Sequence, residues 1–143
     1  MSDLSPEDIA LLEAQVPVGL LMSADETMRL VRVTRGVVEA HVGRAAESVT
    51  TADGLVFWFD TAADCLAVNR MATLNLLAVS EFSPRTVPLL RGQVLITGQL
   101  GGQPDGLTHP QMKALRREPG PVWWVNWVMH VRVERDEQRR RRV

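Results

Sequence analysis

The sequence predicts an α+β protein in which a mostly antiparallel sheet of about 4–6 strands packs with about 4 short helices. The dipeptide Asp53-Gly54 separates two runs rich in strand-forming residues, which is the pattern of a tight β-hairpin. From residue 122 to residue 134 the odd positions are apolar, which predicts a half-buried strand. Polar residues that favour helix N-caps precede three apolar runs with helical spacing: Ser5, Asn69 and Thr108.

Composition places the chain among ordinary packed proteins. Its 143 residues are 45% hydrophobic and 23% charged, which suits one domain with one core. The single cysteine, Cys65, forms no intramolecular disulfide, and the acidic N-terminus does not resemble a signal peptide. No apolar run approaches the length of a membrane span, so we expect a cytoplasmic protein.

In the first third of the chain we expect two helices and a strand. Ser5 and Pro6 begin a helix that ends near residue 15, because Pro17 follows. Residues 28–33 suit a strand. Thr34 is the expected cap of a second helix, and Gly43 is the expected residue that closes it.

The middle of the chain predicts the hairpin, a helix and a further strand. Residues 47–51 and 55–59 form the two hairpin strands, and the second is apolar on both faces, so it is expected in the centre of the sheet. Asn69 caps a helix, Pro84 and Pro88 mark an irregular connection, and residues 92–98 form a strand bounded by glycines. Thr108 begins another helix.

The end of the chain is expected to be a long strand followed by a flexible tail. Residues 122–134 place Trp123 and Trp127 on the core face of that strand, with Trp124 on the opposite face. The four arginines at 139–142 have no apolar neighbours to pack against. The predicted organisation is therefore a domain over residues 1–134 and a flexible arginine-rich tail over residues 135–143.

Charge is divided unevenly between the two parts of the chain. Residues 1–64 carry eleven acidic and four basic side chains, whereas residues 65–143 carry six and twelve. Such asymmetry can orient a binding partner, and a chance distribution of surface charge gives the same pattern. Fifteen of the sixteen basic residues are arginine, which is typical of a GC-rich genome and weakens the interpretation of each arginine as a phosphate ligand.

The residue types that carry catalysis do not form a recognisable motif. His41, His109 and His130 lack the spacing of a metal site, so we expect no metal and no cofactor. The catalytic candidates are Cys65 paired with a histidine, and Asp60 with Asp64. The neighbours of Cys65 favour a small buried thiol instead, and a helix start explains the two aspartates equally well. We therefore expect a protein that is not an enzyme.

Partner binding is the more plausible chemistry for the C-terminal residues. If Trp124 is exposed, it is an aromatic anchor for a protein partner; otherwise a helix covers it. Arginines of the last segment can neutralise phosphates or bind an acidic protein surface, and the nearby carboxylates make a merely solvated end an alternative. The candidate binding residues are Trp124, Arg132, Arg135, Arg139, Arg140, Arg141 and Arg142.

Several segments resemble an uncharacterised family of small proteins from actinobacterial mobile elements and bacteriophages. The similar features are the helix that ends at Gly43, the tryptophan-bearing strand ADGLVFWFD, the helix start at Asn69 and Arg70, and the strand GQVLITG. The resemblance covers about residues 28–118 and leaves out the N-terminal helix and the arginine-rich end. It implies a phage-type accessory protein.

Three functions follow as expectations. The first is regulation or inhibition of a host protein complex, most plausibly the transcription machinery (RNA polymerase), by binding without catalysis. The second is nucleic-acid binding by the arginine-rich C-terminal half, although a pI near 6.3 is low for that class. The third is a small enzyme that uses Cys65 or the Asp60 and Asp64 pair with a histidine.

Overall fold

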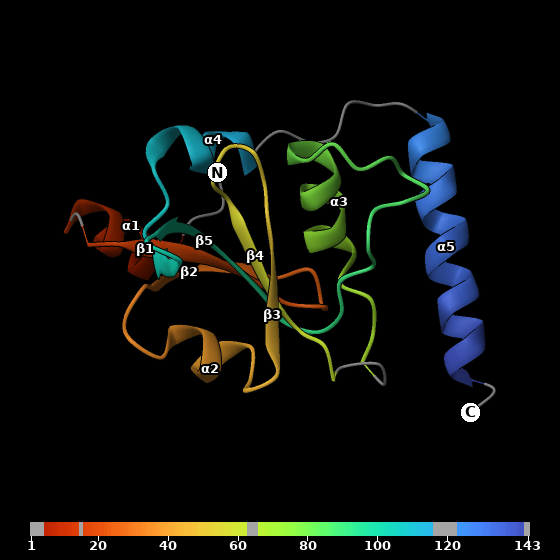
Figure 1. Ribbon diagram of the computed structural model, residues 1–143, viewed down its shortest axis with the longest axis horizontal. Helices are drawn as coiled ribbons and strands as arrows, with labels where there is room; N and C mark the ends of the chain where they lie inside the picture. The colour runs from red at the N-terminus through yellow and green to blue at the C-terminus, as the bar shows by residue number, and fades with distance from the viewer. Residues whose placement is uncertain (1–4, 15, 63–65, 116–122, 142–143) are drawn as a thin grey trace.

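The computed structural model describes residues 5–14, 16–62, 66–115 and 123–141, with the side chains of residues 11–13 and 123–126 outside the description. Within these residues the chain is an α+β fold, as predicted (Figure 1). The elements in chain order are α1 (Pro6–Glu13), β1 (Val18–Met22), β2 (Met28–Arg32), α2 (Val37–His41), β3 (Ala46–Thr50), β4 (Val56–Asp60), α3 (Arg70–Val79), β5 (Val94–Leu100), β6 (Gln103–Asp105), α4 (His109–Leu115) and α5 (Trp123–Arg141).

The strands form one antiparallel sheet. Its order is β2-β1-β5-β4-β3, and the short β6 pairs with the end of β5. The predicted hairpin is confirmed as β3 and β4, and Gly54 adopts φ +80° in its turn. β4 lies between β3 and β5, so its expected interior position is also confirmed.

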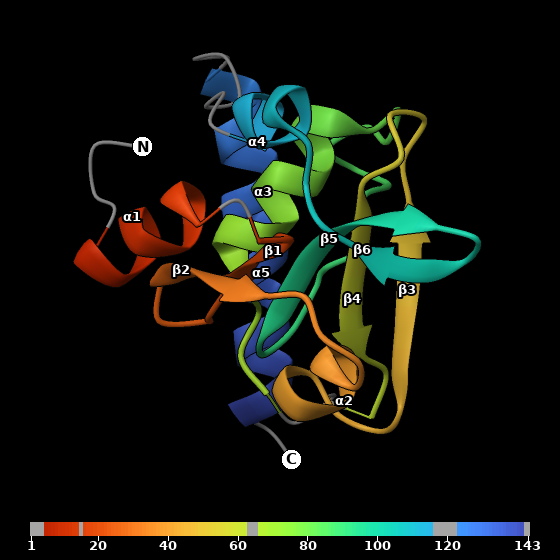
Figure 2. The ribbon, with the colours of Figure 1, turned by 90° about the vertical axis from the view of Figure 1, so that its left-hand side faces the viewer.

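Side chains from one face of the sheet form the main core. Leu20, Phe57 and Ile96 from three neighbouring strands are fully or almost fully buried there, together with Leu76 of α3. In both views α3 lies between the sheet and α5 (Figures 1 and 2). This face is therefore covered by two successive layers of helix.

The opposite face has a smaller apolar cluster. Leu21, Val31 and Leu95 are buried against Val37 of the short helix α2, and Trp58 is half-buried beside them. Figure 2 shows α2 beneath the sheet on the side away from α3. The second face thus depends on a single five-residue helix.

Three of the helix starts have the predicted capping chemistry. The Ser5 hydroxyl accepts a hydrogen bond from the backbone N–H of Asp8 at 3.1 Å, and the Thr108 hydroxyl accepts one from Gln111 at 3.3 Å. Asn69 accepts a hydrogen bond from the N–H of Ala72 at 3.0 Å. Each bond satisfies a backbone donor that the first helical turn leaves free.

The second helix starts later than expected. Its N-cap is Gly36, with φ +81° and no side-chain cap, rather than Thr34. Gly43 adopts φ +131° directly after the helix, so the expected glycine termination is confirmed.

The sequence pattern did not predict the strand β1, whose five residues are all buried. A strand buried on both faces has no alternation of apolar and polar residues, so the sequence lacks the pattern that usually indicates a strand.

The expected C-terminal strand is wrong, because residues 123–141 form the helix α5. The expected flexible tail is corrected at the same point: the helix continues through Arg141, and Asp136 is only 3% exposed. Trp127, expected on the core face of a strand, is 59% exposed, whereas Met129 is fully buried. The buried positions 129 and 136 and the half-buried position 132 follow the spacing of a helix and not the alternation of a strand.

No helix in the described ranges has both the length and the apolar character needed to cross a bilayer.

Candidate functional site

The helix α5 carries most of the sequence-predicted binding residues, and its inner side is attached to the protein by three kinds of contact. Met129 belongs to the main core, and Val128 is 9% exposed. Further along, Arg132 donates a hydrogen bond from Nη1 to the carbonyl oxygen of Pro84 at 2.8 Å. Burial lowers the pKa of the Arg132 guanidinium, which still stays protonated at neutral pH.

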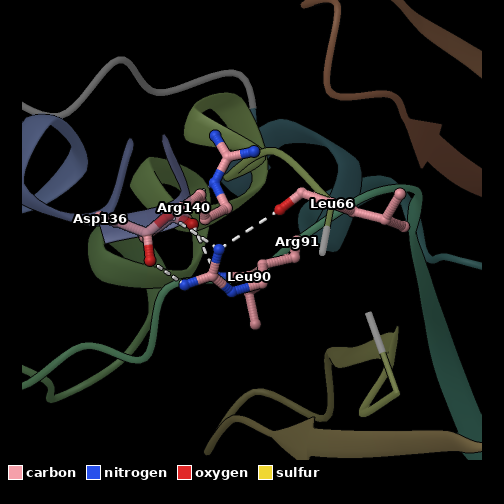
Figure 3. Close-up of polar contacts among 6 residues, drawn as sticks. Leu66, Leu90, Arg91, Asp136 and Arg140 are labelled. Carbon is pink, nitrogen blue, oxygen red and sulfur yellow. Dashed lines mark hydrogen bonds and ion pairs between the residues drawn. The ribbon is translucent and has the colours of Figure 1, made fainter. Parts of the chain in front are cut away.

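A charged cluster fixes the C-terminal half of α5 (Figure 3). Both carboxylate oxygens of Asp136 accept hydrogen bonds from Arg91, one of them at 2.8 Å, and Arg91 also donates to the carbonyl oxygen of Leu66 at 3.3 Å. Arg140, one turn further along the helix, donates from Nε to Asp136 at 3.2 Å. The hydrogen bond from Arg91 is the main reason that the pKa of Asp136 lies below its ordinary value.

The opposite side of α5 faces solvent, and we call it the outer face of α5. It consists of positions separated by helical spacing: Trp127, His130, Glu134, Gln138 and Arg141. His130 and Glu134 lie 3.2 Å apart at an i,i+4 spacing, and both side chains are more than half exposed. An aromatic anchor and titratable groups therefore share one surface of a helix whose other side is held in place.

The predicted binding residues divide into three groups in the structure. Arg132 and Arg140 have partners within the protein: Arg132 bonds to Pro84 and attaches α5 to the body, whereas Arg140 bonds to Asp136 within α5 itself. The side chain of Trp124 and the whole of Arg142 lie outside the described residues. The members that are exposed on α5 are Arg135, Arg139 and Arg141.

The surface charge of α5 is mixed. Five arginines in its described part stand against three carboxylates, at 134, 136 and 137, which gives a net charge of +2. A nucleic-acid interface of the expected kind needs one continuous basic face. Glu134 and Gln138 interrupt such a face on the outer side of this helix.

The catalytic candidates are distributed over different elements. His41 lies at the end of α2, His109 at the start of α4 and His130 on the outer face of α5. Asp60 ends β4 and accepts a hydrogen bond from the N–H of Ala62 at 2.9 Å, while residues 64 and 65 fall outside the described ranges. Among the described residues, no group of three or more histidine, cysteine or acidic side chains is arranged to hold a metal ion.

A groove of about 850 Å³ lies on the sheet face that α2 covers. The indole of Trp58 lines it together with Arg35, Glu39 and Arg44, and the tip of the β5–β6 hairpin forms another wall. The indole Nε1 donates to the Thr97 hydroxyl at 2.9 Å, so its polar atom is used within the protein. The three charged side chains that line the groove are all exposed.

Two features of the α5 region were missed by sequence reasoning. Trp127 was placed in the core because an alternating pattern assigns all odd positions to one face. The attachment by Arg91 and Asp136 joins residues that are 45 positions apart, and no local pattern indicates such a pair. If residues 127–141 are taken as a helix, Trp127 and Met129 lie on different sides of it. Side chains two positions apart on a helix point in different directions.

Comparison with known proteins found no match to this chain among protein-family models, curated proteins or solved structures.

Proposed function

We propose that this protein is a non-catalytic binding protein that recognises a protein partner with the outer face of α5, and that Trp127 is the central contact. The observation that carries the proposal is the 59% exposure of this tryptophan on a helix whose opposite side is buried. Large aromatic side chains contribute most to protein–protein affinity when a partner desolvates them.

The attachment of α5 favours binding because it presents Trp127 on a pre-ordered element. Met129 is fully buried, and the Asp136 carboxylate accepts hydrogen bonds from Arg91, which lies outside α5. A helix that is ordered before binding does not have to lose backbone freedom when a partner arrives. The contact area of Trp127 is therefore available at a low entropic cost.

Exposed arginines further along α5 favour a partner with an acidic surface. The basic rim of α5, which we define as Arg135, Arg139 and Arg141, is exposed toward the C-terminal end of the helix. Arginine side chains pair with carboxylates through two parallel hydrogen bonds. The first partner class to test is a host protein complex such as RNA polymerase, on the basis of the sequence resemblance to phage-type accessory proteins.

A nuclease-treated pull-down with two matched variants tests this function. We expect tagged wild-type protein to retain host proteins after nuclease treatment, and the Trp127→Ala variant to bind them at least about tenfold more weakly. The control is Leu100→Ala, because Leu100 is 74% exposed at the end of β5, and Figure 1 shows β5 on the other side of α3 from α5. Mass spectrometry then shows whether subunits of RNA polymerase are among the retained proteins.

Two outcomes contradict the proposal. Equal retention by both variants removes Trp127 as the contact. Loss of all partners on nuclease treatment, with affinity that falls steeply as salt rises, indicates nucleic-acid binding by the basic rim of α5 instead. That alternative rests on the exposure of Arg135, Arg139 and Arg141.

A further inference from the structure

The two edges of the sheet are protected to different degrees. At the β2 edge the backbone N–H of Leu30 donates to the Asp8 carboxylate of α1 at 3.1 Å. Arginines at positions 29 and 32 add charge along the same strand. Covering elements and charged side chains are the usual means by which proteins prevent edge strands from pairing with other chains.

The β3 edge has open backbone groups. Hydrogen bonds link Thr51 with Leu55 and Thr61 with Ala45, and these pairs mark the ends of the β3–β4 ladder. Because bonded pairs alternate along an antiparallel ladder, the N–H and C=O groups at 46, 48 and 50 point away from β4. In the described part of the chain, no hydrogen bond uses these outward groups.

The sequence of β3 also lacks the features that block pairing. It reads AESVT, with no proline and no lysine or arginine, and its register with β4 is unbroken over five residues. Ser48 and Thr50 are exposed. Figure 2 shows β3 as the outermost strand on the side of the sheet opposite β2.

We propose that β3 pairs with β3 of a second copy of this chain, antiparallel and with Ser48 on the two-fold axis. In this register Ala46 lies opposite Thr50 of the second copy, and Glu47 lies opposite Val49. Glu47, the only charged side chain of the strand, therefore does not lie opposite Glu47 of the second copy. Two like charges directly opposite one another would be unfavourable. Each outward residue both donates and accepts a backbone bond, and the two sheets become one.

A hollow beside the edge, lined by both apolar and polar residues, supports this pairing. Val49 and Thr50 of β3 line it together with Val79 and Phe82, and its volume is about 480 Å³. Phe82 is 38% exposed. A strand added to β3 covers part of this hollow, so the pairing gains apolar burial in addition to backbone hydrogen bonds.

Charge substitutions at the two-fold axis test both the interface and its register. We expect the wild-type protein to reach twice its 15.9 kDa chain mass in light scattering as its concentration rises. Ser48→Lys and Ser48→Glu each place two like charges opposite one another, so each variant alone is expected to have the single-chain mass. An equimolar mixture of the two variants is expected to restore the doubled mass.

Two further variants remove ambiguity. Ser48→Pro removes an outward N–H that the monomer does not use, so it is expected to fold and to stay monomeric. Met28→Lys, at an exposed side chain of the protected strand β2, is the matched control and is expected to leave the dimer intact. Circular dichroism confirms that each variant is folded. A single-chain mass for the wild type at all concentrations, or a dimer that survives both Ser48→Lys and Ser48→Pro, overturns the proposal.

Discussion

Asn69 shows how much one buried side chain can connect. Its amide donates to the carbonyl oxygen of Met22 at 2.9 Å and to that of Gly92 at 2.7 Å. Its side-chain oxygen accepts the N–H of Ala72, which caps α3. The residue is fully buried, so it joins the end of β1, the start of α3 and the approach to β5. The sequence predicted the cap, because capping is local, but not the two donated bonds.

We expect Asn69→Ala to lower the free energy of unfolding by about 3 kcal/mol, because it removes a cap and leaves two buried carbonyl groups unsatisfied. Asn69→Asp keeps the cap acceptor but loses the donors, so it is expected to be similarly destabilising. Urea denaturation measures both. The control is Asn75→Ala, whose half-buried amide bonds to Met71 within the same helix. A loss below about 1 kcal/mol for both Asn69 variants would contradict this role.

Asp136 makes the stability of the protein dependent on acid. Its pKa in the folded state lies below the ordinary value of 3.8, mainly because Arg91 donates hydrogen bonds to the carboxylate. A depressed folded-state pKa adds stability above the unfolded pKa, and this contribution is lost as pH falls through the folded value. The stability difference between the wild type and Asp136→Asn should be constant above about pH 5 and shrink below about pH 4.

Urea denaturation at a series of pH values checks this expectation. At neutral pH the Asp136→Asn variant is expected to be less stable by about 2 kcal/mol, the range of hydrogen bonds to charged groups. Glu134→Gln is the control, because Glu134 is 58% exposed on the outer face of α5. A difference between wild type and Asp136→Asn that does not change with pH would be inconsistent with the Arg91 pair.

The helix α5 shows how an alternating pattern can mislead at the scale of one element. Odd positions from 123 to 133 are apolar, but position 128 is also apolar and is buried. Residues 134–141 have charged or amide side chains without a branch at Cβ, and all of them except Asp136 are strong helix formers. An i,i+4 ion pair between Asp136 and Arg140 adds to the helix. The alternation of apolar residues therefore did not decide the structure of this segment. The helix-forming residues that follow it and the burial of Met129 favoured a helix.

Proline substitution distinguishes the helix from the strand that the pattern favoured. Arg135→Pro is expected to destabilise the protein by about 3 kcal/mol and to reduce the helical circular dichroism, because proline breaks a helix interior. Arg135→Ala is the control, since it removes the same exposed side chain and retains the N–H. An unchanged helical spectrum with Arg135→Pro would refute the assignment of α5.

At the scale of the whole molecule the two faces of the sheet are unequal. One face carries α3 and α5, and Leu76 of α3 is fully buried. The other carries α2, whose only buried residue is Val37. Elements with few buried apolar contacts open at a lower free energy than the core of the domain.

Native-state hydrogen exchange is expected to show this difference directly. The amide of Ala40 in α2 and that of its C-cap Val42 bond to Gly36 and Val38, and both should exchange faster than the α3 amide of Thr73, which bonds to Asn69. The expected reason is local opening of α2 while the main core stays intact. Equal protection of the two helices would mean that α2 opens only when the whole domain unfolds.

Local chemistry determined a large part of this fold from the sequence alone. The Asp53-Gly54 turn, the caps at Ser5, Asn69 and Thr108, and the glycine that ends α2 act over a few residues, so the sequence predicts them. The α+β class follows from these elements together.

Long-range packing decided what the sequence could not. β1 gives no alternating pattern because both its faces are buried, and the type of α5 depends on what covers its inner side. The pairing of Arg91 with Asp136, the exposure of Trp127 and the open edge at β3 are properties of distant segments brought together. A pattern within a segment records which residues are apolar, whereas the neighbours that bury or expose them come only from the tertiary structure.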